Sequence, residues 1–153
     1  MKEILYKAKT KVISGDAYNG GKADGEWVKG FVYDDIGCWK IKQFDFDYCD
    51  YLEYEVDPDT ICQYININDI KGEKLFEGDV VHVVGNKNRE DCKDIDYIGY
   101  IVYMHNCFCV IDGRPNCFSK RTINLLPTIV ELEKIGNIHD NPELVPIIES
   151  DEE

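Results

Sequence analysis

The sequence predicts a mainly β protein with only short helices. Apolar and polar residues alternate with a period of two, so that Leu52, Tyr54 and Val56 share one strand face while Glu53 and Glu55 share the other. Turn-forming residues such as Asp57-Pro58-Asp59 separate these runs. The aromatic content of 12% is high enough for a folded core despite a net charge of −13. We therefore expect antiparallel sheets.

The expected strands cover most of the chain. They lie at residues 4–9, 27–33, 39–42, 51–56, 80–84, 98–104, 107–111 and 135–138. A glycine-rich loop is expected over residues 15–25, and turns over 57–59, 68–72, 105–106 and 112–113. Short helical turns are expected only at 58–62 and 141–144, where Pro58 and Pro142 suit a first turn.

The second half of the chain predicts a small SH3-like barrel. From Leu75 onward, short strands are joined by glycine-containing turns, and Gly99 inside a strand would mark a bend or bulge at a barrel corner. We expect three parts: an N-terminal β part over 1–70, the barrel over 71–145 sharing a core with it, and an acidic tail over 146–153.

Charge is concentrated in two acidic blocks. Residues 43–70 carry eight carboxylates and no Lys, Arg or His, and residues 126–153 carry eight carboxylates against Lys134. This distribution argues against binding to a phosphate backbone, which depends on Lys and Arg. The first block is interleaved with tyrosines. It is either the solvated face of a strand pair or an anionic, aromatic patch for a basic partner. The candidate patch consists of Asp45, Asp47, Asp50, Tyr51, Glu53 and Glu55.

The cysteines predict reduced thiols. Their number, 7, is odd, and the N-terminal segment lacks the apolar core of a secretion signal, so we expect a cytoplasmic protein. We expect no membrane span, because no apolar run approaches about 18 residues. Cys92, His105, Cys107, Cys109 and Cys117 crowd the segment 92–117. A reduced core face, a reactive thiol and a zinc site all stay open for this segment, although a one-residue gap between cysteines is unusual for zinc.

Catalytic motifs are missing from the sequence. There is no phosphate-binding glycine loop, no H-E-x-x-H pair and no nucleophile elbow, and the acidic stretches do not fit a calcium-binding loop. We expect neither an enzyme nor a cofactor.

Several segments, in order along the chain, carry a family resemblance. They are Met1-Lys2-Glu3-Ile4, Trp27-Val28-Lys29-Gly30, Val56-Asp57-Pro58-Asp59-Thr60 with Gln63-Tyr64, Asn68-Asp69-Ile70-Lys71-Gly72-Glu73, Leu75-Phe76-Glu77-Gly78-Asp79-Val80-Val81, and Ile135-Gly136-Asn137-Ile138-His139-Asp140-Asn141-Pro142-Glu143-Leu144. In these the chain resembles the YopX family of phage and prophage proteins. It departs from the family pattern at Ile65-Asn66-Ile67, at Lys71-Gly72, in the insertion 86–96 and in the cysteine-rich segment.

The resemblance implies a two-part β fold with an SH3-like barrel in its later half, a phage setting and a bacterial cytoplasm. It implies no activity and supplies no catalytic residues. We expect an accessory protein that binds a host or phage protein with a basic surface. The alternatives are an acidic mimic of DNA, or direct nucleic-acid binding through the barrel, which the charge makes less favourable. Self-association is expected because small β proteins expose strand edges.

Overall fold

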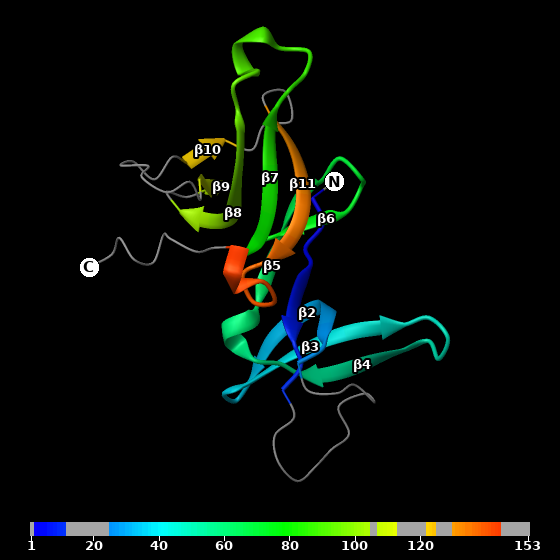
Figure 1. Cartoon of the computed structure of the whole chain (residues 1–153). Helices are drawn as coiled ribbons and strands as arrows, with labels where there is room; N and C mark the ends of the chain where they lie inside the picture. Colours follow the sequence, from blue (N-terminus) through cyan, green and yellow to red (C-terminus); the bar gives the residue numbers. More distant parts are fainter. Residues whose placement is uncertain (1, 12–24, 105–106, 113–121, 125–129, 145–153) are drawn as a thin grey trace, which may run out of the picture. The chain divides into compact units, whose positions relative to one another are not determined.

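The computed structural model describes residues 2–11, 25–104, 107–112, 122–124 and 130–144. These residues form a mainly β protein with two antiparallel sheets and three single-turn 3-10 helices, which confirms the predicted fold class. The chain divides into two compact units, Met1–Tyr64 and Ile65–Glu153 (Figure 1). The predicted division at residue 70, with a shared core and the acidic tail, stays a prediction, and the tail lies outside the described residues.

The described residues of the N-terminal unit contain five strands and one 3-10 helix. They are β1 (Tyr6–Lys9), β2 (Trp27–Asp35), β3 (Cys38–Asp45), β4 (Asp50–Glu55), η1 (Pro58–Thr60) and β5 (Cys62–Asn68), with β5 crossing into the second unit. The strand order is β4-β3-β2-β1-β5, followed by β6 (Lys74–Phe76). Ala8, Val28, Ile41, Tyr54 and Val56 form the core of this unit. The alternation that predicted these strands therefore also selected the buried face.

The end of β1 turns back toward the end of β4. Thr10 forms a bridge with Val56, and the backbone N–H of Lys11 donates to the carbonyl of Glu55 at 2.9 Å. Thr60 adds a side-chain link, because its Oγ1 accepts from the N–H of Lys9 at 2.8 Å. These contacts curl the sheet, but the pairing is one bridge and not a ladder, so the sheet is not closed within the described residues.

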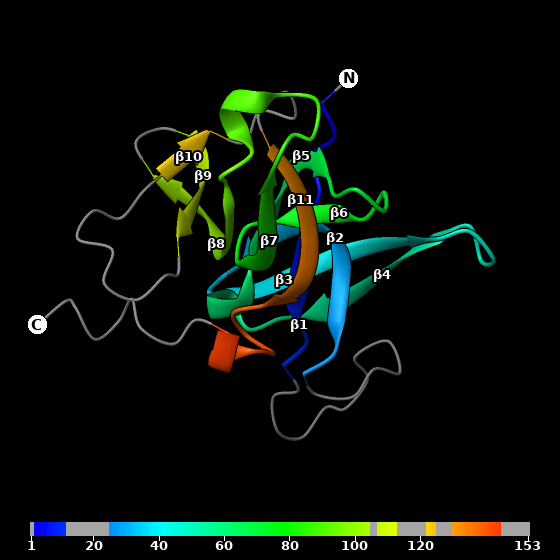
Figure 2. The same cartoon turned by 45° about the horizontal axis from the view of Figure 1, so that its top comes forward.

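The described part of the C-terminal unit contains β6 and the remaining strands. They are β7 (Asp79–Gly85), β8 (Asp96–Met104), β9 (Cys107–Asp112), β10 (Thr122–Asn124) and β11 (Val130–Asn137), with η2 (Glu90–Cys92) and η3 (Pro142–Leu144). Their order is β10-β9-β8-β7-β11, and β7 lies beside β11 in both views (Figures 1 and 2). Leu75, Val81, Val83, Ile101 and Val110 are central in its core.

The SH3-like barrel predicted over residues 71–145 is not confirmed. In the described part of this unit the sheet has two ends, β10 and β11, which do not pair with each other. Gly99 was predicted to mark a bend or bulge, and no bulge occurs there. The β7–β8 ladder runs through Gly99 without a register shift and pairs it with Val81, and the β8–β9 ladder ends at its pair with Asp112. A Cβ at this position would lie 2.2 Å from the carbonyl oxygen of Ile111, so close strand packing is what requires glycine.

Most predicted strands are confirmed, but β5, β6 and β10 were missed. Residues 58–62 were expected to be helical, whereas the helix ends at Thr60 and β5 begins at Cys62. The alternation in Ile65-Asn66-Ile67 could have revealed β5. Asn66 adopts a positive φ of 62°, an uncommon conformation inside a strand that sequence patterns do not show. The residues of the expected turns at 105–106 and 113, and most of the loop 15–25, lie outside the described residues.

Candidate protein-binding surface on the β3–β4 hairpin

The predicted patch lies on the hairpin formed by β3 and β4. The two strands pair in register from Lys40 with Glu55 to Asp45 with Asp50, and residues 46–49 form the turn. The hairpin extends beyond the rest of the N-terminal unit as a two-stranded arm (Figures 1 and 2). The alternation of β4 keeps Tyr54 in the core, while the end of the arm carries no buried residue.

The structure separates the six predicted patch residues into two groups. Asp45, Asp47, Asp50 and Tyr51 lie together at the hairpin tip, which we define as residues 44–51. Glu53 and Glu55 lie farther along β4, where lysines face them. Lys42 Nζ is 3.3 Å from Glu53 Oε1, and Lys40 is the cross-strand neighbour of Glu55. The tip therefore holds the carboxylates of the patch that have no ion pair among the described residues.

Two of the tip carboxylates also stabilise the turn. Asp45 Oδ1 accepts from the backbone N–H of Asp47 at 2.9 Å, and Asp50 Oδ1 accepts from the N–H of Tyr51 at 2.8 Å. Cys49 completes the turn with a positive φ of 50°. These bonds show that a structural role explains part of the acidic block. Asp47 is exposed, and no hydrogen bond of its carboxylate occurs within the described residues.

The tip also exposes aromatic side chains. Phe46 and Tyr48 are each 82% exposed, and Tyr51 is 51% exposed. The Phe44 ring lies edge-on to Phe46 at 4.8 Å and to Tyr51 at 5.2 Å. Sequence reasoning selected the tyrosines of the block and missed Phe44 and Phe46. The strand register was the missing signal, because it places Phe44 directly opposite Tyr51.

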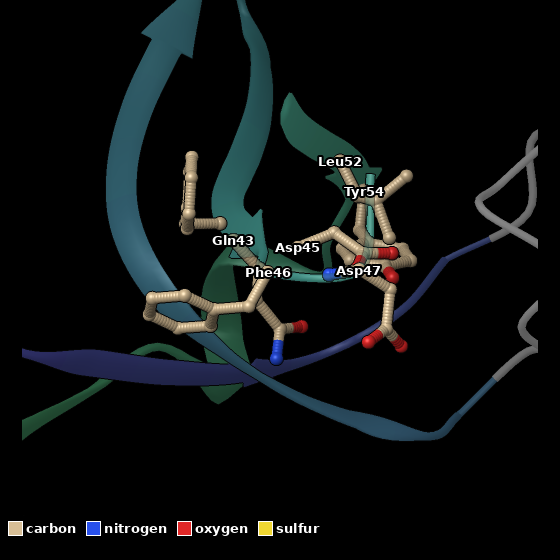
Figure 3. A pocket seen from close by; sticks show the side chains of 7 residues that line it. Gln43, Asp45, Phe46, Asp47, Leu52 and Tyr54 are labelled. Carbon is tan, nitrogen blue, oxygen red and sulfur yellow. The ribbon is translucent and has the colours of Figure 1, made fainter. Parts of the chain in front are cut away.

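A hollow of about 320 Å³ lies at the hairpin tip. Its lining residues are Gln43, Phe44, Asp45, Phe46, Asp47, Leu52 and Tyr54 (Figure 3). The carboxylates of Asp45 and Asp47 lie near each other on one side of it, next to Leu52 and Tyr54, and the Phe46 ring lies on the opposite side. A carboxylate pair beside aromatic rings can receive a cationic side chain, because charge attraction and ring contact act together.

The cysteine-rich segment does not form a metal centre in the part that is described. No group of three or more His, Cys, Asp or Glu side chains suited to a metal occurs among the described residues. Cys92 and Cys109 are buried, Cys107 is exposed, and Phe108 packs against the core of its unit. His82 pairs with Asp96, with Nε2 2.7 Å from Oδ1. His105 and Cys117 lie outside the described residues.

The segments that carry the family resemblance have structural roles. Asp57 caps η1 by accepting from the N–H of Asp59 at 3.0 Å, with Pro58 in the first position. Asn137, which is buried, accepts from the N–H groups of His139 and Asp140 at 3.0 and 2.9 Å. Gly78 has a positive φ of 87°, a backbone conformation that favours glycine. These motifs hold turns together.

The family model for "YopX protein" matches residues 31–146 of the 153. The chain belongs to the YopX family. A comparison with curated proteins found no match. The YopX match begins within β2 and covers the hairpin, η1 and the whole sheet of the C-terminal unit. In the described residues, no helix is long and apolar enough to cross a bilayer.

Proposed function

We propose that this YopX protein is a non-enzymatic protein-binding module whose hairpin tip binds a basic surface of a host or phage protein. One observation carries the proposal: an exposed aromatic cluster, Phe44, Phe46, Tyr48 and Tyr51, shares the end of a projecting hairpin with three carboxylates that lack ion pairs in the described structure.

The chemistry of the tip suits a protein partner. Exposed aromatic rings contribute large contact areas with little loss of side-chain entropy, which is why they concentrate at the centres of interfaces. Asp45, Asp47 and Asp50 add a local charge of −3 that speeds encounter with a cationic surface and disfavours acidic ones. Lysine or arginine side chains can enter the hollow between Phe46 and the carboxylates.

The alternative of a DNA mimic is less well supported. A mimic needs unpaired carboxylates spread over an extended surface, whereas Glu53 pairs with Lys42 and Asp35 pairs with Lys40 at 2.8 Å. The hairpin tip by itself is a small surface compared with a segment of DNA duplex. Direct nucleic-acid binding through residues 71–145 stays a weaker alternative, since that segment carries no excess of positive charge.

The SH3-like barrel also stays a proposal. The strand order β4-β3-β2-β1-β5, with a 3-10 helix before β5, is that of SH3-type domains, and the Thr10–Val56 bridge supplies part of a closure. We propose an SH3-like arrangement for the N-terminal unit, whereas the barrel predicted over residues 71–145 stays unconfirmed. The phage setting, the cytoplasmic location and self-association belong to the same proposal.

Affinity capture from a phage-infected host, followed by titration of the purified captured protein, tests the function. The tip variant is Asp45→Asn, Asp47→Asn, Asp50→Asn with Phe46→Ser. Asparagine keeps the oxygen that accepts from the turn, so the hairpin stays folded while its charge is removed. Phe31→Ser with Asp94→Asn is the matched control, because it removes an exposed phenylalanine and a carboxylate elsewhere.

We expect the tip variant to bind the captured protein at least about tenfold more weakly and the control to bind normally. Equal binding by wild type and the tip variant would refute the role of the tip. The DNA mimic would be favoured if affinity fell steeply as the salt concentration rose and if the Phe46→Ser change had no effect on affinity.

A further inference from the structure

One edge of β4 is not covered by another described strand. β4 ends its sheet and pairs with β3 on one side, and both strands run along the projecting arm (Figure 1). In an antiparallel pair, the backbone groups of successive residues point alternately toward the neighbouring strand and away from it. Every second residue of β4 therefore directs its N–H and its carbonyl away from β3.

Hydrogen bonds at the C-terminal end of β4 identify the residues that point outward. The N–H of Val56 donates to the carbonyl of Trp39 at 2.9 Å, so Val56 points toward β3. The carbonyl of Glu55 accepts from the N–H of Lys11 at 2.9 Å and therefore points away from β3. Alternation then directs the backbone of Glu53 outward as well. The bond from Lys11 closes this end of the edge.

The N-terminal end of the edge is closed by a side chain of β4 itself. Tyr51 is the third residue that points outward, and its N–H donates to Asp50 Oδ1 at 2.8 Å. Between the two ends, the N–H and the carbonyl of Glu53 and the carbonyl of Tyr51 have no hydrogen bond to other described residues. These three groups form a short open edge that a further strand can pair with.

We propose that the basic partner binds as an added β-strand along residues 51–54, with its backbone hydrogen-bonded to Glu53. The inference rests on the proposed function, because it specifies how the partner of the hairpin binds. In an antiparallel alignment, the partner residue opposite Glu53 exchanges two hydrogen bonds with it, and the carbonyl of Tyr51 accepts a third. In such complexes the backbone bonds supply affinity and the alternating side chains supply specificity.

The side chains of β4 determine which strand fits. Tyr51 and Glu53 lie on one face of the arm, whereas Leu52 and Tyr54 lie on the other and line the hollow of the hairpin tip. An arginine opposite Glu53 contacts a carboxylate, and an arginine opposite Tyr51 contacts an aromatic ring. Apolar side chains opposite Leu52 and Tyr54 lie over the hollow. The strand that fits therefore alternates arginine with an apolar residue such as valine.

Charge complementarity favours a basic strand over an acidic one. β4 carries Asp50, Glu53 and Glu55 and no lysine or arginine, a charge of −3 over its 6 residues. Lys42 Nζ lies 3.3 Å from Glu53 Oε1, but the Glu53 side chain keeps 46% of its surface exposed, so a second cation can reach it. An acidic strand would place carboxylates opposite these residues and would be repelled.

Peptide titration into the full-length protein, followed by fluorescence anisotropy, tests the proposal. The probe is a labelled peptide of alternating arginine and valine whose valine backbone nitrogens are methylated. This methylation blocks the peptide edge that faces away from β4 and prevents the peptide from pairing with itself. The comparison peptide is methylated on the arginine backbone nitrogens instead. It has the same side chains and charge, but it cannot donate to the carbonyls of Glu53 and Tyr51.

A substitution on the protein side removes the same pairing. Glu53→Pro deletes an N–H that takes no part in the β3–β4 ladder, and proline is tolerated at such edge positions. Glu53→Gln is the matched control, because it removes the same carboxylate and keeps the N–H. Thermal unfolding followed by circular dichroism verifies that both variants are folded. If Glu53→Pro is not folded, the two methylated peptides decide the outcome.

We expect saturable binding of the probe and at least about tenfold weaker binding of the peptide methylated on arginine. Glu53→Pro should bind the probe at least about tenfold more weakly than Glu53→Gln does. Nuclear magnetic resonance should show that hydrogen exchange of the Glu53 amide slows when the probe binds. No binding of the probe, equal binding of the two peptides, or equal binding by the two folded variants would overturn the proposal.

The captured protein separates this inference from the proposed function. Normal binding by folded Glu53→Pro, together with weakened binding by the tip variant, would refute strand addition and leave the tip as the binding surface. Normal binding by the tip variant would refute the proposed function itself.

Discussion

The side chain of Asp69 accepts a hydrogen bond from the backbone N–H of Lys134 at 3.1 Å, joining positions 65 apart in the sequence. Its other oxygen accepts from the N–H groups of Lys71 and Glu73, each at 2.9 Å. Asp69 is only 7% exposed. One carboxylate therefore fixes the turn before β6 and attaches it to β11, all within the C-terminal unit.

We predict that Asp69→Asn destabilises the C-terminal unit by about 1–3 kcal/mol. The asparagine side chain has one oxygen, so it cannot accept from both the turn and Lys134, and a buried backbone donor is left unsatisfied. Urea unfolding followed by circular dichroism measures the loss. Asp94→Asn, which changes an exposed carboxylate of the same unit, should cost less than about 0.5 kcal/mol. Equal effects of the two variants would contradict this role of Asp69.

The same carboxylate should make stability depend on pH. Burial by itself raises the pKa of Asp69, but the backbone donors of Glu73, Lys134 and Lys71 outweigh it and hold the pKa below 3.8. A lowered folded-state pKa means that the stabilisation is complete above the unfolded pKa near 3.8 and is lost as the pH falls through the folded value. The difference in melting temperature between wild type and Asp69→Asn should therefore be constant from pH 7 to pH 5 and shrink in stronger acid. A difference that grows in acid would contradict the assignment.

Gly99→Ala should destabilise the C-terminal unit by about 2 kcal/mol or more. The added Cβ would lie 2.2 Å from the carbonyl oxygen of Ile111, which is backbone and cannot move without separating β8 from β9. Gly72→Ala is the comparison, because no atom lies within 4 Å of its Cβ and only the φ of 84° is strained. We expect it to cost about 1 kcal/mol. Chemical denaturation of both variants should give this order, and the reverse order would refute the close-approach argument.

The cysteines should react with a thiol reagent in the order of their exposure. Cys49 is exposed, Cys38 is half-buried, and Cys62, Cys92 and Cys109 are buried. Burial, with the nearby Glu55 carboxylate, raises the pKa of the Cys38 thiol above 9.0, which lowers its reactive thiolate fraction at neutral pH. Mass spectrometry after brief labelling at pH 7 should find Cys49 modified before Cys38. Glu55→Gln should speed the labelling of Cys38, and an unchanged rate would remove Glu55 as a cause.

Sedimentation velocity tests the expected self-association. Among the described strands, β4 and β6 end one sheet and β10 and β11 end the other. Asp50 Oδ1 already accepts from the N–H of Tyr51, which is a group that a further strand would need. We therefore expect that a strand of a second copy does not pair with the start of β4, and that Asp50→Ala increases self-association. A concentration-independent monomer for both proteins would refute self-association.

The sequence by itself determined the mainly β fold class, most of the strands and the family. Period-two alternation placed most strands, because a strand buries every second side chain whatever it packs against. The turn motifs could be recognised from the sequence because the residues that stabilise a turn are neighbours in the chain. They lie at Asp57–Thr60, at Asn68–Glu73 and at residues 135–144.

Only the tertiary structure decided which distant groups meet. Phe44 lies opposite Tyr51 because of the register between β3 and β4. Trp39 and Pro58 line one hollow because the start of β3 lies next to η1. The hydrogen bond from the Lys134 N–H to Asp69 depends on where β11 pairs. None of these contacts is encoded by neighbouring residues, since each arises from the way sheets close over a core and bring remote strands together.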